Sequence, residues 1–264
     1  SVINVYAASN NIVNLQNSWC QLSNNTASYG NYSIDLSSNP LTTVPTCFWA
    51  QPFRGLQLGN THLPTFPTAL FNSYMEYFYW YGNDMVLPIS SWTLDKWAVN
   101  MYDLELVGIG LSGPFPVGLK TFANLQYIYL GSNQLTGTLP DDFFSNMPNL
   151  YVFSAGYNLL TGAFPTSISA TSGYMEYLEV PGNQFTTLPS VIGACQQLYY
   201  IDFSDNLLTS IPPTNVWANL TALQYIYIGG NRHLTGTLPQ SWFNYPIYAV
   251  NASSCSFSGD HPAL

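Results

Sequence analysis

The chain has 264 residues, of which 47% are hydrophobic and only 6% are charged. Thirteen acidic residues outnumber four basic ones, so the formal net charge is −9. This composition excludes nucleic acid and anionic membrane surfaces as partners, because both require clustered lysine and arginine side chains. No apolar run approaches the roughly 18 residues of a membrane-spanning helix, so we expect no membrane insertion within this segment.

A repeating pattern of leucine-like residues and asparagine runs from one end of the chain to the other. Its plainest copy has Leu125, Ile128, Leu130, Asn133 and Leu135, followed by Thr-Gly-Thr-Leu-Pro at 136–140. We take the Asn of each copy as its mark. The eleven marks, spaced 22 to 29 residues apart, are Asn10, Asn39, Thr61, Asn83, Ile109, Asn133, Asn158, Asn183, Asn206, Asn231 and Cys255. A repeat of this length predicts a solenoid, in which each unit stacks on the next.

Each unit is predicted to contain a short strand before its mark, in which alternate residues point in opposite directions. The apolar members point inward. In chain order they include Ile34 and Leu36, Leu56 and Leu58, Leu104 and Leu106, Ile128 and Leu130, Ile201 and Phe203, and Ile226 and Ile228. Because one unit cannot bury its apolar side alone, neighbours must stack, giving a spine on the order of 50 Å long.

The marked Asn follows the strand, where the chain turns inward, and a buried amide there bridges backbone groups of adjacent units. We therefore expect a ladder of Asn side chains along the solenoid. Thr61 and Cys255 are expected to contribute weakly to it. Ile109 has no polar side chain, so the sequence predicts a local irregularity at that unit.

Two of the four cysteines belong to the first two units. Cys20 lies ten residues after its mark and Cys47 eight after the next, which places both on the convex side of adjacent units. We predict that they form a disulfide, which stabilises by roughly 3.5 kcal/mol in the chain-entropy model. Cys195 and Cys255 are two or more units apart and out of phase, and we interpret both as buried small hydrophobic residues.

This pattern resembles the leucine-rich repeat family over essentially the full chain. Leu-Thr/Ser-Gly-x-Leu/Phe-Pro, found at 111–116, 135–140, 160–165 and 234–239, looks like the plant-type extracellular subfamily of receptor ectodomains and polygalacturonase-inhibiting proteins. The resemblance implies a curved right-handed solenoid of about eleven repeats. It further implies a parallel β-sheet on the concave face and short 3-10, irregular or second-strand segments on the convex face. We treat 1–264 as one solenoid domain, which can be a fragment of a longer chain.

Tyrosine and acidic residues gather on the predicted concave face, at the positions six, four and two before each mark. We predict ligand binding by Tyr77, Tyr79, Tyr81, Asp103, Glu105, Tyr127, Tyr129, Tyr177, Glu179, Tyr200, Asp202, Tyr225 and Tyr227. Tyrosine also favours strands, so sheet stability alone explains part of the enrichment. None of the four basic residues is expected on this face. Such a face suits either a glycan, by ring stacking and carboxylate hydrogen bonds, or a protein segment carrying Lys or Arg.

Catalysis and metal binding find little support in the sequence. His62, His233 and His261 lie in distant units and cannot converge, and no zinc spacing or phosphate-binding loop is present. Asp103 and Glu105 share a face but have no water-excluding pocket. Glu179 and Asp202 occupy one column of adjacent units and are expected to be solvated carboxylates rather than a calcium site. We expect no enzyme activity, no metal and no cofactor.

Four Asn-x-Ser/Thr sequons begin at Asn24, Asn31, Asn219 and Asn251, and each is a candidate glycosylation site. With the predicted disulfide, they indicate an extracellular or cell-surface location. Two functions remain open. The first is a recognition or adhesion module that binds a protein or carbohydrate ligand. The alternative is a structural coat, cell-wall or filament glycoprotein that self-associates end to end, because no cap is visible at either end of the repeat.

Overall fold

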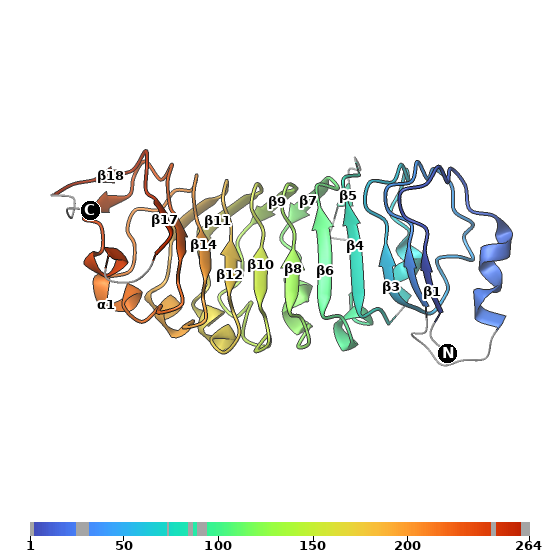
Figure 1. The fold of residues 1–264 in the computed structure, drawn as a ribbon, viewed down its shortest axis with the longest axis horizontal. Helices are drawn as coiled ribbons and strands as arrows, with labels where there is room; N and C mark the ends of the chain where they lie inside the picture. Colours follow the sequence, from blue (N-terminus) through green and yellow to red (C-terminus); the bar gives the residue numbers. More distant parts are fainter. Residues whose placement is uncertain are drawn as a thin grey trace.

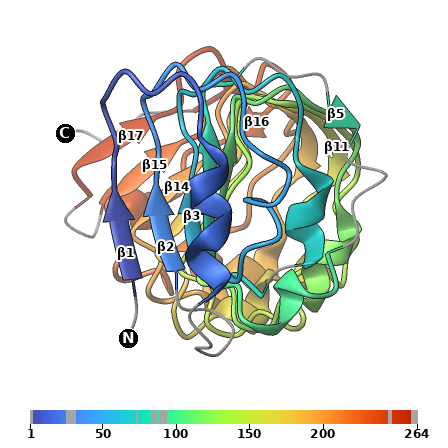
Figure 2. The same cartoon turned by 90° about the vertical axis from the view of Figure 1, so that its right-hand side faces the viewer.

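The computed structural model describes residues 3–24, 32–72, 74–83, 87–88, 94–243 and 247–259. They form an elongated stack of repeat units with the two termini at opposite ends (Figure 1). Seen end-on, the strands of one long sheet lie on one side of the stack, and β5 (Leu87–Pro88) and β11 (Leu159–Ala163) lie on the other (Figure 2).

The long sheet contains eleven strands, and every neighbouring pair is parallel. In order they are β1 (Ile3–Tyr6), β2 (Tyr32–Asp35), β3 (Phe53–Gln57), β4 (Tyr77–Tyr81), β6 (Asp103–Val107), β8 (Tyr127–Tyr129), β10 (Val152–Ser154), β12 (Tyr177–Glu179), β14 (Tyr200–Asp202), β15 (Tyr225–Tyr227) and β17 (Ala249–Asn251). Each unit therefore contributes one strand to this sheet, as the repeat predicted.

Alternation along each strand divides buried from exposed residues. In β4 the side chains of Phe78 and Trp80 are fully buried, while Tyr77, Tyr79 and Tyr81 are half-buried. The predicted inward pairs, such as Ile128 with Leu130, form part of one continuous core. Stacking of units thus buries the apolar side that no single unit can cover.

The chain turns inward after every strand through a residue with a left-handed backbone. This residue directly precedes each of the eleven marks, with φ between 51° and 76°. The residues are Ser9, Ser38, Asn60, Gly82, Gly108, Ser132, Tyr157, Gly182, Asp205, Gly230 and Ser254. The backbone therefore turns in the same way after every strand, whichever residue type occupies the position before the mark.

The predicted Asn ladder is present inside this corner. Asn158 accepts a hydrogen bond from Leu135 N–H of the preceding unit at 3.0 Å and donates to Leu130 C=O at 2.9 Å. The same two bonds recur at Asn133, Asn183, Asn206 and Asn231. Adjacent units are therefore joined by buried amides as well as by the sheet.

The three non-Asn marks behave as their chemistry predicts. Thr61 donates to Asn83 Oδ1 at 3.0 Å, and the Cys255 thiol donates to Ile228 C=O at 3.3 Å. At Ile109 the expected irregularity is present, because Gly110 adds a second left-handed residue (φ 72°) directly after the mark. No other described residue in that position has a positive φ.

The opposite side of the stack consists of short segments. A second parallel sheet contains β5, β7 (Leu111–Pro114), β9 (Gln134–Gly137), β11 and β13 (Gln184–Thr187), and β16 (Thr235–Gly236) pairs with β18 (Ser256–Phe257). The helical turns are η1 (Asn17–Asn24), η2 (Thr68–Asn72), η4 (Trp97–Val99), η5 (Val117–Thr121), η6 (Thr166–Thr171), η7 (Ser190–Ala194), α1 (Thr214–Trp217) and η8 (Gln240–Phe243). None of these described helices is long and apolar enough to cross a lipid bilayer.

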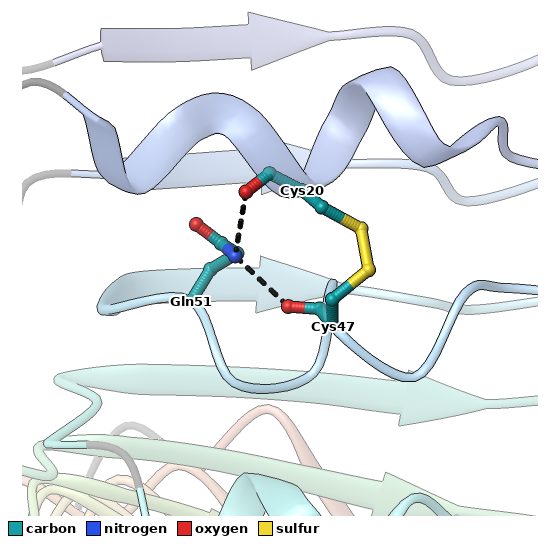
Figure 3. Close-up of a disulfide and its surroundings, with 3 residues drawn as sticks. All are labelled: Cys20, Cys47 and Gln51. Atoms are coloured by element: carbon teal, nitrogen blue, oxygen red, sulfur yellow. Dashed lines mark hydrogen bonds between the residues drawn. A yellow bond between two sulfur atoms is a disulfide. The ribbon is translucent and has the colours of Figure 1, made fainter.

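The predicted disulfide between Cys20 and Cys47 is confirmed. It ties η1 to the next unit with a Cα–Cα distance of 5.4 Å. The Gln51 amide donates to Cys47 C=O at 2.8 Å and to Cys20 C=O at 3.4 Å, linking the same two segments (Figure 3). Cys195 is free and buried, as predicted. The prediction for Cys255 was wrong, since this thiol is only partly buried.

Candidate functional site

The outward surface of the eleven-stranded sheet is the predicted concave face, and we call it the sheet face. All thirteen predicted ligand-binding residues lie on it and are half-buried. Strand register aligns them into columns across units. Tyr177, Tyr200 and Tyr225 are direct neighbours in one column, and Glu179, Asp202 and Tyr227 are direct neighbours in the next.

Four further tyrosines join this surface, and the sequence reasoning missed them. Tyr102, Tyr151, Tyr199 and Tyr248 stand seven residues before their marks, one residue outside the columns considered. Ring contacts at 5.4 to 6.0 Å connect Tyr127, Tyr151, Tyr177, Tyr199, Tyr225 and Tyr248 in one unbroken series. The recurrence of Tyr at this position was visible in the sequence and could have revealed them.

Tyrosine rings adopt two different orientations on the sheet face. From β12 to β15 the rings face one another, since Tyr200 lies 6.2 Å from Tyr177 and 5.9 Å from Tyr225, with interplanar angles of 28° and 35°. These rings therefore form a row of packed aromatic side chains across three neighbouring strands. On β4, by contrast, Tyr77 lies over Gly55 of β3, and Tyr81 lies over Gly59, two residues beyond the end of β3.

Partial burial changes the acidity of several carboxyl groups on the sheet face. Burial raises the pKa of Asp103, Glu105 and Glu179 above the ordinary values. Tyr79 donates a hydrogen bond to Asp103 Oδ2 at 2.5 Å, while Asp103 Oδ1 is buried and has no partner among the described residues. Burial also raises the pKa of Tyr129 to about 12, so its hydroxyl stays a neutral donor. A ligand group that carries positive charge or donates hydrogen bonds would stabilise the charged form of these carboxylates.

Other polar groups on this surface are already held in place. Asp202 Oδ1 accepts from the Ser204 N–H at 2.8 Å and hydroxyl at 2.6 Å, and Asp35 is bound in the same way by Ser37. The expectation of no basic residue at this surface needs a correction. Arg54 lies on β3 at the edge of the sheet face and pairs with Glu76 at 2.9 Å. Like the missed tyrosines, it stands seven residues before its mark.

The structure brings together no convergent catalytic or metal-binding group among the residues it describes. No set of three His, Cys, Asp or Glu side chains within that part of the chain is placed to hold a metal ion. Glu179 and Asp202 are register neighbours, but Glu179 accepts from the Ser154 hydroxyl at 3.4 Å and Asp202 binds Ser204. Asp103 and Glu105 lie on the same strand, β6, at an open surface.

The sequons occupy different places in the fold. Asn251 is exposed on β17, on the sheet face as predicted, and its Oδ1 accepts from Ser253 N–H at 3.0 Å. Asn219 is exposed after α1, and Asn24 is the last residue of η1. Asn31 lies outside the described residues. Attachment of a glycan at any of them stays a prediction.

The raised pKa of Asp103 predicts a pH-dependent stability. A carboxyl whose folded pKa lies above its unfolded value binds protons first in the folded state, so its unfavourable contribution at neutral pH is relieved as pH falls. The wild type should therefore gain stability, relative to Asp103→Asn, as pH falls from 7 through the raised pKa toward 3.8. Urea unfolding of both proteins across this range measures the difference, with Asp95→Asn as an exposed control. A difference that does not vary with pH contradicts the prediction.

Eleven stacked parallel strands, a buried Asn ladder and a second sheet behind them define the class: this is a leucine-rich repeat solenoid. The Leucine Rich Repeat family model matches residues 124–146. Receptor protein-tyrosine kinase CEPR1 of Arabidopsis thaliana is 31% identical over 128 residues, which are 38% of this chain and 13% of the kinase.

Solved structures show the same fold. The Arabidopsis receptor kinase HAESA, in complex with the peptide hormone IDA and the co-receptor SERK1, has a TM-score of 0.77 at 19% identity, over 98% of this chain and 51% of that one. A plant ice-binding protein has a TM-score of 0.61 at 21% identity, over 83% of this chain and 70% of that one. The predicted resemblance to plant receptor ectodomains is thus confirmed for the fold, and the chain spans 13% of the curated relative and about half of HAESA.

Proposed function

We propose that the chain is an extracellular recognition module whose sheet face binds an extended protein segment carrying lysine or arginine. Charge carries the proposal. The strands of this face and the residues directly before them include seven carboxylates and one basic residue: Asp35, Glu76, Asp103, Glu105, Glu176, Glu179 and Asp202, and Arg54. Arg54 is already paired with Glu76. The remaining carboxylates are interleaved with tyrosine, the residue that recognition surfaces favour.

Burial supports a cationic ligand in particular. Asp103, Glu105 and Glu179 lose part of their hydration, which raises their pKa values. A guanidinium or ammonium group from a ligand supplies the charge and donors that water no longer supplies. From β12 to β15 the tyrosine hydroxyls add hydrogen-bonding groups beside these carboxylates.

The extracellular location rests on two further observations. The Cys20–Cys47 disulfide belongs to a class of bond that forms and persists in oxidising compartments. The compared proteins include a receptor protein-tyrosine kinase and a receptor kinase bound to a peptide hormone. An extended peptide on eleven strands would cover roughly 50 Å, which is room for about fifteen residues.

Peptide arrays test the proposal directly. The probes are Lys- and Arg-containing peptides, and the same peptides with Gln in place of each base. We expect binding to the basic set alone, its abolition by Tyr127→Ser/Tyr129→Ser/Tyr225→Ser/Tyr227→Ser, and about tenfold weaker binding for Asp103→Asn/Glu105→Gln. Asp95→Asn/Asp142→Asn removes the same charge away from the sheet face and should leave binding unchanged. Equal binding of the basic and neutral peptides would reject the proposal.

A second candidate, end-to-end self-association in a coat, cell wall or filament, is favoured by the last described unit. A hollow of about 630 Å³ opens there, lined by apolar side chains that include Leu238, Trp242, Ile247 and Phe257. Tyr248 in the same lining is 74% exposed. Sedimentation separates the two functions: a monomer at high concentration is expected of a recognition module, whereas filaments or concentration-dependent oligomers support self-association.

A further inference from the structure

Two tyrosine rings at the β3–β4 part of the sheet face lie flat over glycines. A Cβ atom added to Gly55 would lie 1.8 Å from Tyr77 Cζ and 2.2 Å from both flanking Cε atoms. Added to Gly59, it would lie 2.1 Å from Tyr81 Cζ and 2.3 and 2.4 Å from the flanking carbons. Such nearly equal distances place the missing Cβ over the plane of each ring. Each ring therefore rests with one face on β3 and turns its other face outward.

This arrangement depends on glycine in the neighbouring unit. Gly55 is the register partner of Tyr77, and Gly59 lies two residues beyond the end of β3, against the Tyr81 ring. Any side chain at these positions would hold the rings away from the strand. No other described glycine of the sheet face has a tyrosine ring against it; Gly131 has its nearest contact at 3.4 Å, to Gly156 C=O. The β3–β4 region is thus a place where two tyrosine rings lie flat over glycines of the neighbouring unit.

A row of hydrogen-bonding side chains runs between the two rings. Gln57 stands between Gly55 and Gly59 on the same face of β3, with Asp35 and Tyr79 as its register partners on either side. Asp35 Oδ1 accepts hydrogen bonds from the Ser37 N–H and hydroxyl groups, so this carboxylate is held in place beside Gln57. Tyr77 and Tyr81 are four residues apart on β4, or about 13 Å. The surface is therefore two flat apolar platforms separated by a polar strip.

We infer that this surface is a binding site for a neutral oligosaccharide built of pyranose rings with equatorial hydroxyls, such as a β-glucan. The axial C–H groups of such a sugar form a flat apolar face that packs on an aromatic ring, and its hydroxyls lie at the ring edge where Gln57 and Asp35 can bind them. A spacing of about 13 Å exceeds one sugar ring, so an oligosaccharide rather than a monosaccharide is needed to cover both platforms.

Charge decides which oligosaccharides fit. Asp35 and Glu76 border the platforms, and Glu105 lies one strand beyond Tyr79. Uronic acids and other anionic sugars are repelled by these carboxylates, whereas neutral sugars donate hydrogen bonds to them. The ligand inferred for this surface is a neutral oligosaccharide and not a basic peptide, so separate titrations with glucan and with peptide test the two proposals independently.

Calorimetric titration with a soluble β-1,4-glucan oligosaccharide, and with an oligogalacturonide of equal length, tests the site. We expect the neutral oligosaccharide to bind and the anionic one not to bind. Tyr77→Ser and Tyr81→Ser should each weaken binding by about two- to tenfold, the range of one aromatic contact, while Tyr77→Phe and Tyr81→Phe retain it.

Gly55→Ala is the decisive variant, because it adds one methyl group and removes no ligand contact. It should lift the Tyr77 ring and weaken glucan binding as Tyr77→Ser does, whereas Gly131→Ala, on the same face but away from any ring, should bind normally. Absence of glucan binding, binding unchanged in Tyr77→Ser/Tyr81→Ser, or capture of a proline-rich peptide in place of glucan would overturn the inference.

Discussion

Replacing Cys20 and Cys47 with serine is expected to lower the free energy of unfolding by about 3.5 kcal/mol, because the bridge closes a long loop and restricts the unfolded chain. The two cysteines are 27 residues apart in sequence and belong to adjacent units. In a solenoid each unit contacts only its neighbours, so the loss should be concentrated at the N-terminal end. η1 and the first three strands should open before the rest of the stack.

Hydrogen exchange resolved along the chain measures this effect. Protection should fall for the amides of β1 to β3 in the Cys20→Ser/Cys47→Ser variant, and stay unchanged from β10 to β15. Mild reduction of the wild type should reproduce the variant. Cys255→Ser, which alters a free thiol, serves as the control. Equal loss of protection in all strands would show that the bridge acts on the whole solenoid rather than on its first units.

Replacing Asn158 with leucine is expected to cost about 3 kcal/mol, because it breaks one complete rung of the Asn ladder. Leu135 N–H loses the Asn158 Oδ1 atom that accepts its hydrogen bond at 3.0 Å. The carbonyl groups of Leu130, Ala155 and Gly156 each lose one of their donors. Asn158 is 6% exposed, so water cannot replace these bonds.

Asn10 offers a matched control for the ladder. It occupies the same position in the first unit, but it is exposed, and within the described residues its side chain bonds to Ala7 and Ala8 of its own unit. Asn10→Leu should therefore change stability by less than about 0.5 kcal/mol. Urea denaturation of both variants gives the comparison. Similar losses at the two positions would mean that the amide shapes the corner within one unit and does not join neighbouring units.

Much of the architecture follows from the sequence because the repeat itself determines which residues of adjacent units lie side by side. The recurrence of the marks every 22 to 29 residues places the strands of adjacent units side by side. Period-two alternation then determines that Ile128 points inward and Tyr129 outward. The same phase brought Cys20 near Cys47 and predicted the Asn ladder, including the break at Ile109. The prediction for Cys255 failed because the last described unit has no described neighbour to cover it, a fact about stacking rather than about residue type.

The candidate site was predictable only in part. The positions six, four and two residues before each mark identified the predicted tyrosines and carboxylates. Tyr151 and Tyr199 stand directly before their strands, where period-two alternation alone does not place a side chain on the sheet face. Burial of Asp103, and the pKa shift that follows from it, depends on neighbours in two other units.

By itself the sequence determined the solenoid, the side on which each strand residue lies, and the tyrosine-rich, acidic character of one face, because these depend on spacing and alternation within a unit. Only the tertiary structure decided how the tyrosines are presented. Tyr200 packs between the rings of Tyr177 and Tyr225 on the neighbouring strands, and the Tyr77 ring lies flat because Gly55 leaves room beneath it. The orientation of an aromatic ring is determined by the residue one unit away, which becomes its neighbour only once the chain has folded.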